Sequence, residues 1–168
     1  TGVSPTLIVT VPDRPQGKYL QLTPPPIKIW AEKNKIPFLQ PDDLQATSYK
    51  LQANSYQLFL VASYGKIIPK TIFDLPERGA LNLHPSLLPS YRGPTPIQSA
   101  ILDGVTESGV TLMLLDEALD HGPIVETKNY NLKTKNFVEA RDDLAKLGAQ
   151  LFLDVAPAWV TGKVKAVT

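Results

Sequence analysis

Short apolar runs that alternate with helical patterns constrain the fold of this 168-residue chain more than any other feature. The strongest run covers residues 57–62, is nearly continuous, and is typical of a central parallel strand covered on both faces. Shorter runs predict further strands over residues 7–11, 36–39, 80–84, 110–115 and 124–132, the last as an edge strand. Helical spacing predicts helices over residues 27–35, 70–73, 95–103 and 136–156, and a weaker one near Leu44 capped by Asp42 or Asp43.

Strands that alternate with helices predict an open, mostly parallel, Rossmann-like α/β sheet with flanking helices. Residues 12–26, with their run of three prolines, are predicted as a loop, and Pro157 is predicted to end the longest helix. The length and the 43% hydrophobic composition indicate one domain over residues 1–168. In such a sheet, ligands bind beyond the carboxyl ends of the strands, and His84 and Asp116 both follow predicted carboxyl ends.

The segment that begins at Asn82 carries the residues with the most evident chemistry. Asn82 and His84 are two positions apart, so on a strand their side chains leave the same face. Pro85 and Pro89 prevent the strand from continuing and predict a shaped loop directly after it. Asp120, in a second loop, adds a carboxylate. An amide donor, an imidazole and a carboxylate suit acyl-group transfer without a covalent intermediate.

Each of these three residues also has an ordinary structural interpretation. Asn82 and Asp120 are common turn residues, and a lone histidine beside an apolar strand is commonly a buried structural residue. The chain has no cysteine, which excludes thiol chemistry, and its two histidines lack metal-ligand spacing, so we expect no metal. Ser86 lies near His84 but is not part of a G-x-S-x-G elbow.

The net charge of +1 creates no global field that would attract nucleic acid. Any such binding would depend on a local basic patch near the proline-rich segment, formed by Arg14, Lys18, Lys28, Lys33 and Lys35. A solvated helix face explains Lys28, Lys33 and Lys35 equally well. No apolar run approaches the length of a membrane span. We expect a cytoplasmic monomer without a membrane partner, and leave an organellar location open.

Two long motifs resemble the catalytic core of the folate-dependent formyltransferases. They are NLHPSLLPSYRGPTPIQSAILDG at residues 82–104 and TESGVTLMLLDEALDHGPIV at residues 106–125. Within that superfamily, the segments VPDRPQG, LTPPPIK, FLQP and VASYGKIIP resemble the methionyl-tRNA formyltransferases in particular. The resemblance extends from about Leu7 to about Val125 and implies the formyltransferase fold.

The resemblance implies that the chain transfers the formyl group of 10-formyltetrahydrofolate, a co-substrate, to the amino group of methionyl initiator tRNA in translation initiation. By motif, the catalytic residues are Asn82 and His84, which stabilise the oxyanion, and Asp120, which orients His84 and assists proton removal. The folate contacts implied are Ser86, Leu87, Leu88 and Pro89, with Tyr64, Lys66, Ile67, Ile68 and Asp116 around the neighbouring cleft. The tRNA contacts implied are Arg14, Lys18 and Arg92.

The chain differs from the family pattern in three ways. The family's first strand, glycine-containing turn and helix have no counterpart before Leu7, and no segment after Trp159 corresponds to the family's C-terminal barrel, so we expect an incomplete catalytic domain. Lys18 replaces an arginine, which keeps the charge but loses the planar fork. Two alternatives follow: formyl transfer to an amino sugar nucleotide or to glycinamide ribonucleotide, and an inactive fragment that binds folate or tRNA.

Overall fold

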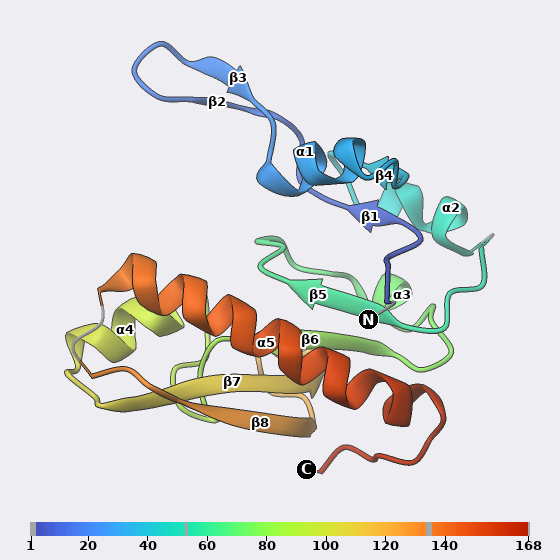
Figure 1. The fold of residues 1–168 in the computed structure, drawn as a ribbon. Coiled ribbons are helices and arrows are strands. Elements are labelled where there is room, and N and C mark those ends of the chain that lie inside the picture. Colours follow the sequence, from blue (N-terminus) through green and yellow to red (C-terminus); the bar gives the residue numbers. More distant parts are fainter. Residues whose placement is uncertain (1–2, 53, 134–135, 168) are drawn as a thin grey trace. The chain divides into compact units, whose positions relative to one another are not determined.

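The computed structural model describes residues 3–52, 54–133 and 136–167 (Figure 1). The chain divides into two compact units, Thr1–Lys50 and Leu51–Thr168. The interpretation of residues 1–168 as a single domain stays a prediction. In the part of the chain that the structure describes, no helix combines the length and the apolarity needed to cross a membrane.

The first unit contains a small parallel β-α-β arrangement. Strand β1 (Ile8–Val9) pairs in parallel with β4 (Phe38–Leu39), and helix α1 (Pro26–Lys33) lies between them in the sequence. Pro26 occupies the first turn of α1, where a missing N–H breaks no helical hydrogen bond. The predicted strands and helix in this region are therefore confirmed, with slightly shorter bounds.

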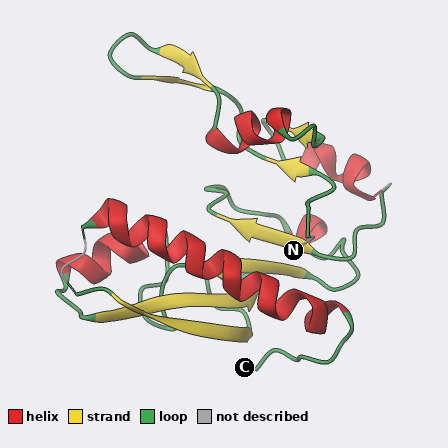
Figure 2. Ribbon diagram, viewed as in Figure 1, coloured by secondary structure: helices red, strands yellow, loops and turns green. Residues whose placement is uncertain are grey.

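The predicted loop at residues 12–26 is wrong in part, because it contains a two-stranded antiparallel ribbon. Strand β2 (Arg14–Gln16) pairs with β3 (Gln21–Thr23), as Figure 2 shows. Gly17, with φ +69°, and Leu20, with φ +49°, provide the left-handed backbone that turns one strand into the other. The ribbon is largely exposed, so no alternation of buried and exposed residues marked it in the sequence.

The second unit is built on a four-stranded sheet in the order β5-β6-β7-β8 (Figure 1). Its strands are β5 (Phe59–Ala62), β6 (Ala80–His84), β7 (Glu107–Leu114) and β8 (Ile124–Asn131). Strands β5 and β6 are parallel, whereas β6 with β7 and β7 with β8 are antiparallel. The predicted α/β class with flanking helices is confirmed, and so is the prediction that β8 is an edge strand. The sheet contains both parallel and antiparallel pairs of strands.

Strand β5 was predicted to be central and covered on both faces, but within this sheet it lies at the end and its residues alternate between half-buried and exposed. Strand β7 follows helix α4 (Pro96–Leu102) and pairs antiparallel with β6, so that Thr111 lies opposite His84 and Leu114 lies opposite Leu81. It therefore returns through the sheet from the end at which β6 finished. A pattern of apolar residues identifies a strand but carries no information about its direction.

Helix α5 (Phe137–Val160) crosses the sheet in Figure 1 and buries its apolar side against β7 and β8, with Leu144 and Leu151 in the common core. Asn136 caps it by accepting a hydrogen bond from the Glu139 amide. The prediction that Pro157 ends this helix is wrong. The helix continues to Val160, where Trp159 donates to the Arg78 carbonyl at 2.9 Å and packs against the core.

Three short helical segments complete the chain. The 3-10 turn η1 (Gln45–Thr47) and α2 (Ser48–Gln52) follow Leu44, which is the N-cap residue in place of the predicted Asp42 or Asp43; the Asp43 carboxylate accepts a hydrogen bond from the Gln45 amide. Helix α3 (Lys70–Phe73) lies between β5 and β6, as predicted.

Candidate active site

Three buried polar side chains meet beside strand β6. Asn82 and His84 are on β6, with exposed fractions of 9% and 4%, and Asp120, in the loop between β7 and β8, is 9% exposed. The Asp120 Oδ1 atom lies 3.5 Å from Asn82 Nδ2 and 3.5 Å from His84 Nδ1. Both distances are long for hydrogen bonds, and catalytic hydrogen bonds commonly tighten only when the substrate binds.

Asp120 is held in place by backbone conformation and by a main-chain donor. Its φ is +50°, a left-handed value that is strained for an ordinary residue. Its Oδ2 atom accepts a hydrogen bond from the Gly93 amide at 2.9 Å. Just after it, a Cβ atom at Gly122 would collide with the Leu114 carbonyl, so only glycine fits there. A buried carboxylate requires partners of this kind to remain charged.

The contacts of His84 define which ring nitrogen carries a proton. Nε2 lies 2.8 Å from the Tyr91 carbonyl oxygen. Because a carbonyl oxygen can only accept, Nε2 must donate to it. Nδ1 then faces Asp120, so it is the nitrogen through which His84 exchanges a proton or a hydrogen bond with that carboxylate.

The loop after β6 is fixed by buried hydroxyl groups. The Thr111 hydroxyl, fully buried on β7, donates to the Ser86 carbonyl at 2.7 Å and accepts from the Leu88 amide at 3.1 Å. The Ser86 hydroxyl donates to the Ser90 carbonyl at 2.6 Å. A Cβ atom at Gly109 would collide with the Leu87 side chain, so the loop packs closely on β7. The segment from Ser86 to Pro89 is therefore held rigidly beside His84.

A second loop lies at the same end of the sheet. Since β5 is parallel to β6, the residues after Ala62 lie at the end where β6 finishes. This loop contains the remaining predicted cleft residues, Tyr64, Lys66, Ile67 and Ile68. The Tyr64 hydroxyl oxygen is buried without a hydrogen-bond partner among the described residues, and burial raises the pKa of this phenol. Ile67 is 90% exposed.

Asp116 follows the carboxyl end of β7, as predicted, but this end is not the one at which His84 lies. Strand β7 runs opposite to β6, and the Leu115 amide donates to the Ala80 carbonyl at 2.8 Å. The carboxyl end of β7 therefore lies beside the amino end of β6. Asp116 there accepts from the Ala118 amide and lies 3.4 Å from His121 Nδ1. The structure brings Asp120, but not Asp116, to Asn82 and His84.

The three residues predicted to contact tRNA are all exposed. Arg14 and Lys18 belong to the β2–β3 hairpin of the first unit, where the Lys18 ammonium lies 5.9 Å from the centre of the Tyr19 ring. Arg92 belongs to the second unit and lies between Tyr91 and Gly93.

Sequence reasoning missed Tyr91, Gly93 and Thr111. Tyr91 and Gly93 contribute main-chain atoms, which have no signature in the sequence beyond the glycine itself. Thr111 did carry a signal, because a hydroxyl in the middle of the buried apolar run at residues 110–115 needs a hydrogen-bond partner.

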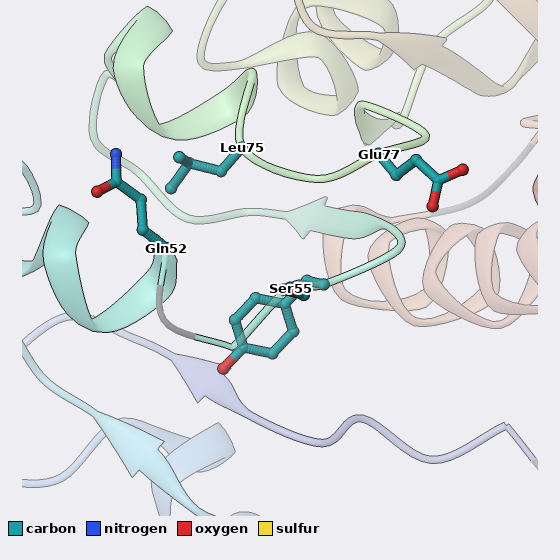
Figure 3. Close-up of a pocket in the computed structure, with 5 residues that line it drawn as sticks. Gln52, Ser55, Leu75 and Glu77 are labelled. Carbon is teal, nitrogen blue, oxygen red and sulfur yellow. The ribbon is translucent and has the colours of Figure 1, made fainter.

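A surface pocket occurs elsewhere in the second unit (Figure 3). Its lining residues precede β5 and β6 and lie around α3, at the end of the sheet opposite His84: Gln52, Ser55, Tyr56, Leu75 and Glu77. Among the described residues, no group of three histidine or acidic side chains gathers to hold a metal ion.

The formyl transferase family matches residues 1–155, and the chain belongs to this family. The methionyl-tRNA formyltransferase of Chloroflexus aurantiacus is 43% identical over 161 residues, which cover 94% of this chain and 52% of the relative. That of Listeria welshimeri is 42% identical over 163 residues, which cover 95% of the chain and 52% of the relative. The chain thus spans about half the length of these relatives.

Solved structures show the same fold at lower identity. A phosphoribosylglycinamide formyltransferase from Anaplasma phagocytophilum superposes with a TM-score of 0.77 at 20% identity, covering 95% of this chain and 88% of that chain. A formyltransferase from Anoxybacillus kamchatkensis, solved in complex with a nucleotide sugar and tetrahydrofolate, gives a TM-score of 0.67 at 23% identity, covering 96% and 80%. This likeness concerns the fold alone.

Proposed function

We propose that this chain carries the catalytic site for transfer of a formyl group from 10-formyltetrahydrofolate to the amino group of methionyl initiator tRNA. The observation that carries the proposal is the meeting of Asn82, His84 and Asp120, whose 3.5 Å contacts can shorten when a substrate binds. The identity of 42% to 43% with methionyl-tRNA formyltransferases supports tRNA as the acceptor.

The reaction joins the acceptor nitrogen to the formyl carbon and breaks the bond from that carbon to the folate nitrogen. Negative charge develops on the formyl oxygen as the amine attacks. The Asn82 amide is placed to donate a hydrogen bond to this oxygen. Asp120, oriented by the Gly93 amide and by His84, accepts the proton that the amine loses. A proton returns to the folate nitrogen as it leaves, so charge and atoms balance.

We further propose that folate binds between the loops that follow β5 and β6. Tyr64 supplies a buried hydroxyl without a partner among the described residues, and Ile67 supplies exposed apolar surface for a planar ring. The segment from Ser86 to Pro89, which the Thr111 hydroxyl fixes to β7, lies next to His84 and is the proposed wall of the site on the β6 side. Lys66 and Ile68 stay predicted contacts. Asp116 also stays a predicted contact, one that would have to reach the folate from the loop that carries Asp120.

The hairpin is the proposed tRNA contact within the first unit. Arg14 and Lys18 provide positive charge for phosphates, and the neighbouring Tyr19, 86% exposed, provides a ring on which a base can stack. Arg92 is the proposed contact in the second unit. An exposed cationic side chain can adjust its position to a backbone phosphate more easily than a buried cationic side chain can.

The test is formylation of methionyl initiator tRNA by the chain and by its His84→Ala variant, followed as formyl-methionyl-tRNA on an acid gel. We expect product from the chain and none from the variant. Parallel reactions with glycinamide ribonucleotide and with an amino sugar nucleotide compare acceptors. Turnover of either small acceptor in place of tRNA would contradict the proposal. Folate binding without turnover of any acceptor would also contradict it, and would favour an inactive binding fragment.

A further inference from the structure

Two main-chain groups of the segment Tyr91–Gly93 contact His84 and Asp120, one group for each residue. The Tyr91 carbonyl accepts the Nε2 hydrogen of His84 at 2.8 Å, and the Gly93 amide donates to Asp120 Oδ2 at 2.9 Å. The two bonds lie on the sides of His84 and Asp120 that face away from their 3.5 Å contact with each other. A shift of this segment would therefore change the position of both groups together.

The Tyr91 side chain is anchored through both its ring and its hydroxyl. Tyr91 has φ +56°, a left-handed value that a residue with a Cβ rarely adopts. Its ring packs against the hydrophobic core, and its hydroxyl donates to Asp103 Oδ2 at 3.0 Å. Asp103 is the residue that ends helix α4. Desolvation and the Asp103 contact raise the pKa of this phenol.

We propose that Tyr91 is a positioning residue: its side chain, anchored to Asp103, holds the left-handed turn whose carbonyl and following amide fix His84 and Asp120. The segment acts on the proton-transfer groups without contacting the reacting atoms. The kinetic part of this inference depends on the proposed formyl transfer. The structural part, which concerns the protonated nitrogen of His84, does not depend on any substrate.

Tyr91→Phe is the most selective variant, because it removes one hydroxyl and keeps the ring in the core. Asp103→Ala breaks the same hydrogen bond from the other side. Tyr130→Phe is the matched control, since the Tyr130 hydroxyl donates to Asp143 at 2.9 Å, a bond of the same kind between β8 and α5. All three variants are compared in the complete chain by nitrogen-15 NMR of the histidine rings. The two histidines are assigned with His121→Gln.

In the wild-type chain, we expect His84 to give a protonated, slowly exchanging Nε2–H signal. In Tyr91→Phe and Asp103→Ala, this hydrogen should exchange faster and the Nδ1-protonated form should gain population. The kcat for formyl transfer should fall about tenfold with KM unchanged, because a small misplacement of catalytic groups affects the transition state most. Tyr130→Phe should lower the melting temperature and leave both the His84 signals and kcat unchanged.

An unchanged His84 spectrum in Tyr91→Phe or in Asp103→Ala would overturn the inference. So would a lower melting temperature without any change at His84, since that outcome describes a purely structural hydrogen bond. If the wild-type chain gives the expected His84 spectrum but transfers no formyl group, the proposed function fails and the positioning role stands. The two proposals are thus tested separately.

Discussion

The cluster around Asp120 and the β2–β3 hairpin place polar groups in opposite ways. In the cluster, Asn82, His84 and Asp120 are each at most 9% exposed, and protein atoms surround them. In the hairpin, Tyr19 and Leu20 at the tip are 86% and 72% exposed. The base of the hairpin is nevertheless fixed, because Asp13 accepts hydrogen bonds from Lys28 and from Gln40 at 2.7 Å each.

The buried cluster has features that suit catalysis, whereas the exposed hairpin has features that suit binding. Preorganised donors lower a barrier because they do not have to reorient when charge develops, and burial in a low dielectric strengthens them. A backbone phosphate, by contrast, is contacted well by exposed and adaptable cations, at an affinity that depends on salt. We therefore expect changes in the cluster to act on turnover, and changes in the hairpin to act on tRNA affinity.

The largest expected effect is that of Asp120→Asn. The variant keeps the size of the side chain and loses the charge that accepts a proton, so kcat should fall by roughly 10³. The measurement is steady-state formylation, with folding monitored by circular dichroism. A reduction below tenfold in a folded variant would show that another group accepts the proton.

Thr111→Val should act on the loop that supports the cluster. The substitution keeps the shape but leaves the Ser86 carbonyl and the Leu88 amide without their buried partner. The free energy of unfolding should fall by about 2 kcal/mol, the usual cost of a buried group left unpaired. Urea unfolding measures it, and Thr111→Ser, which retains the hydroxyl, serves as the control. Equal stability of Thr111→Val and Thr111→Ser would contradict this role of the Thr111 hydroxyl.

Lys18→Ala tests the hairpin and should have a smaller effect. Loss of one phosphate contact should raise the KM for tRNA a few-fold at moderate salt, with kcat unchanged, and should reduce the dependence of tRNA affinity on salt. The matched control is Lys163→Ala, an exposed lysine near the chain end. An equal change in both variants would indicate a general charge effect rather than a hairpin contact.

The smallest expected effect concerns the base of the hairpin. Hydrogen bonds from Lys28 and Gln40 hold the pKa of Asp13 below its ordinary value of 3.8. A lowered pKa in the folded state stabilises the fold above pH 3.8, and this contribution is lost as the pH falls through the lowered value. Asp13→Asn should therefore flatten the acid dependence of the melting temperature. If the melting temperature depends on pH equally in the wild-type chain and in Asp13→Asn, Asp13 does not contribute to the acid dependence of stability.

Sequence patterns identified the strand at residues 80–84 with its correct bounds, and the spacing of Asn82 and His84 correctly placed both on one face. They identified the strand that became β7 but not its direction, and a parallel β7 would have placed Asp116 at the end of the sheet where His84 lies. The direction of a strand depends on the end of the sheet at which the preceding connection leaves the chain, and apolar spacing carries no information about this.

The contribution of main-chain atoms to the site was likewise beyond sequence reasoning. Any residue supplies a carbonyl like that of Tyr91, so no residue type marks it. Pro157 illustrates the opposite error, in which a strong local rule was overruled by packing. Half-buried Trp159 packs against the core and donates to the Arg78 carbonyl, and the helix continues for one more turn.

The central claim is that the buried cluster of the second unit performs formyl transfer. Single-turnover formylation of methionyl initiator tRNA, with 10-formyltetrahydrofolate and enzyme both saturating, tests it most directly in the chain and in Asn82→Ala. Removal of one oxyanion donor typically costs ~3 to 4 kcal/mol, so the rate constant should fall by roughly a hundredfold or more. An Asn82→Ala variant that transfers formyl at the wild-type rate would contradict the account.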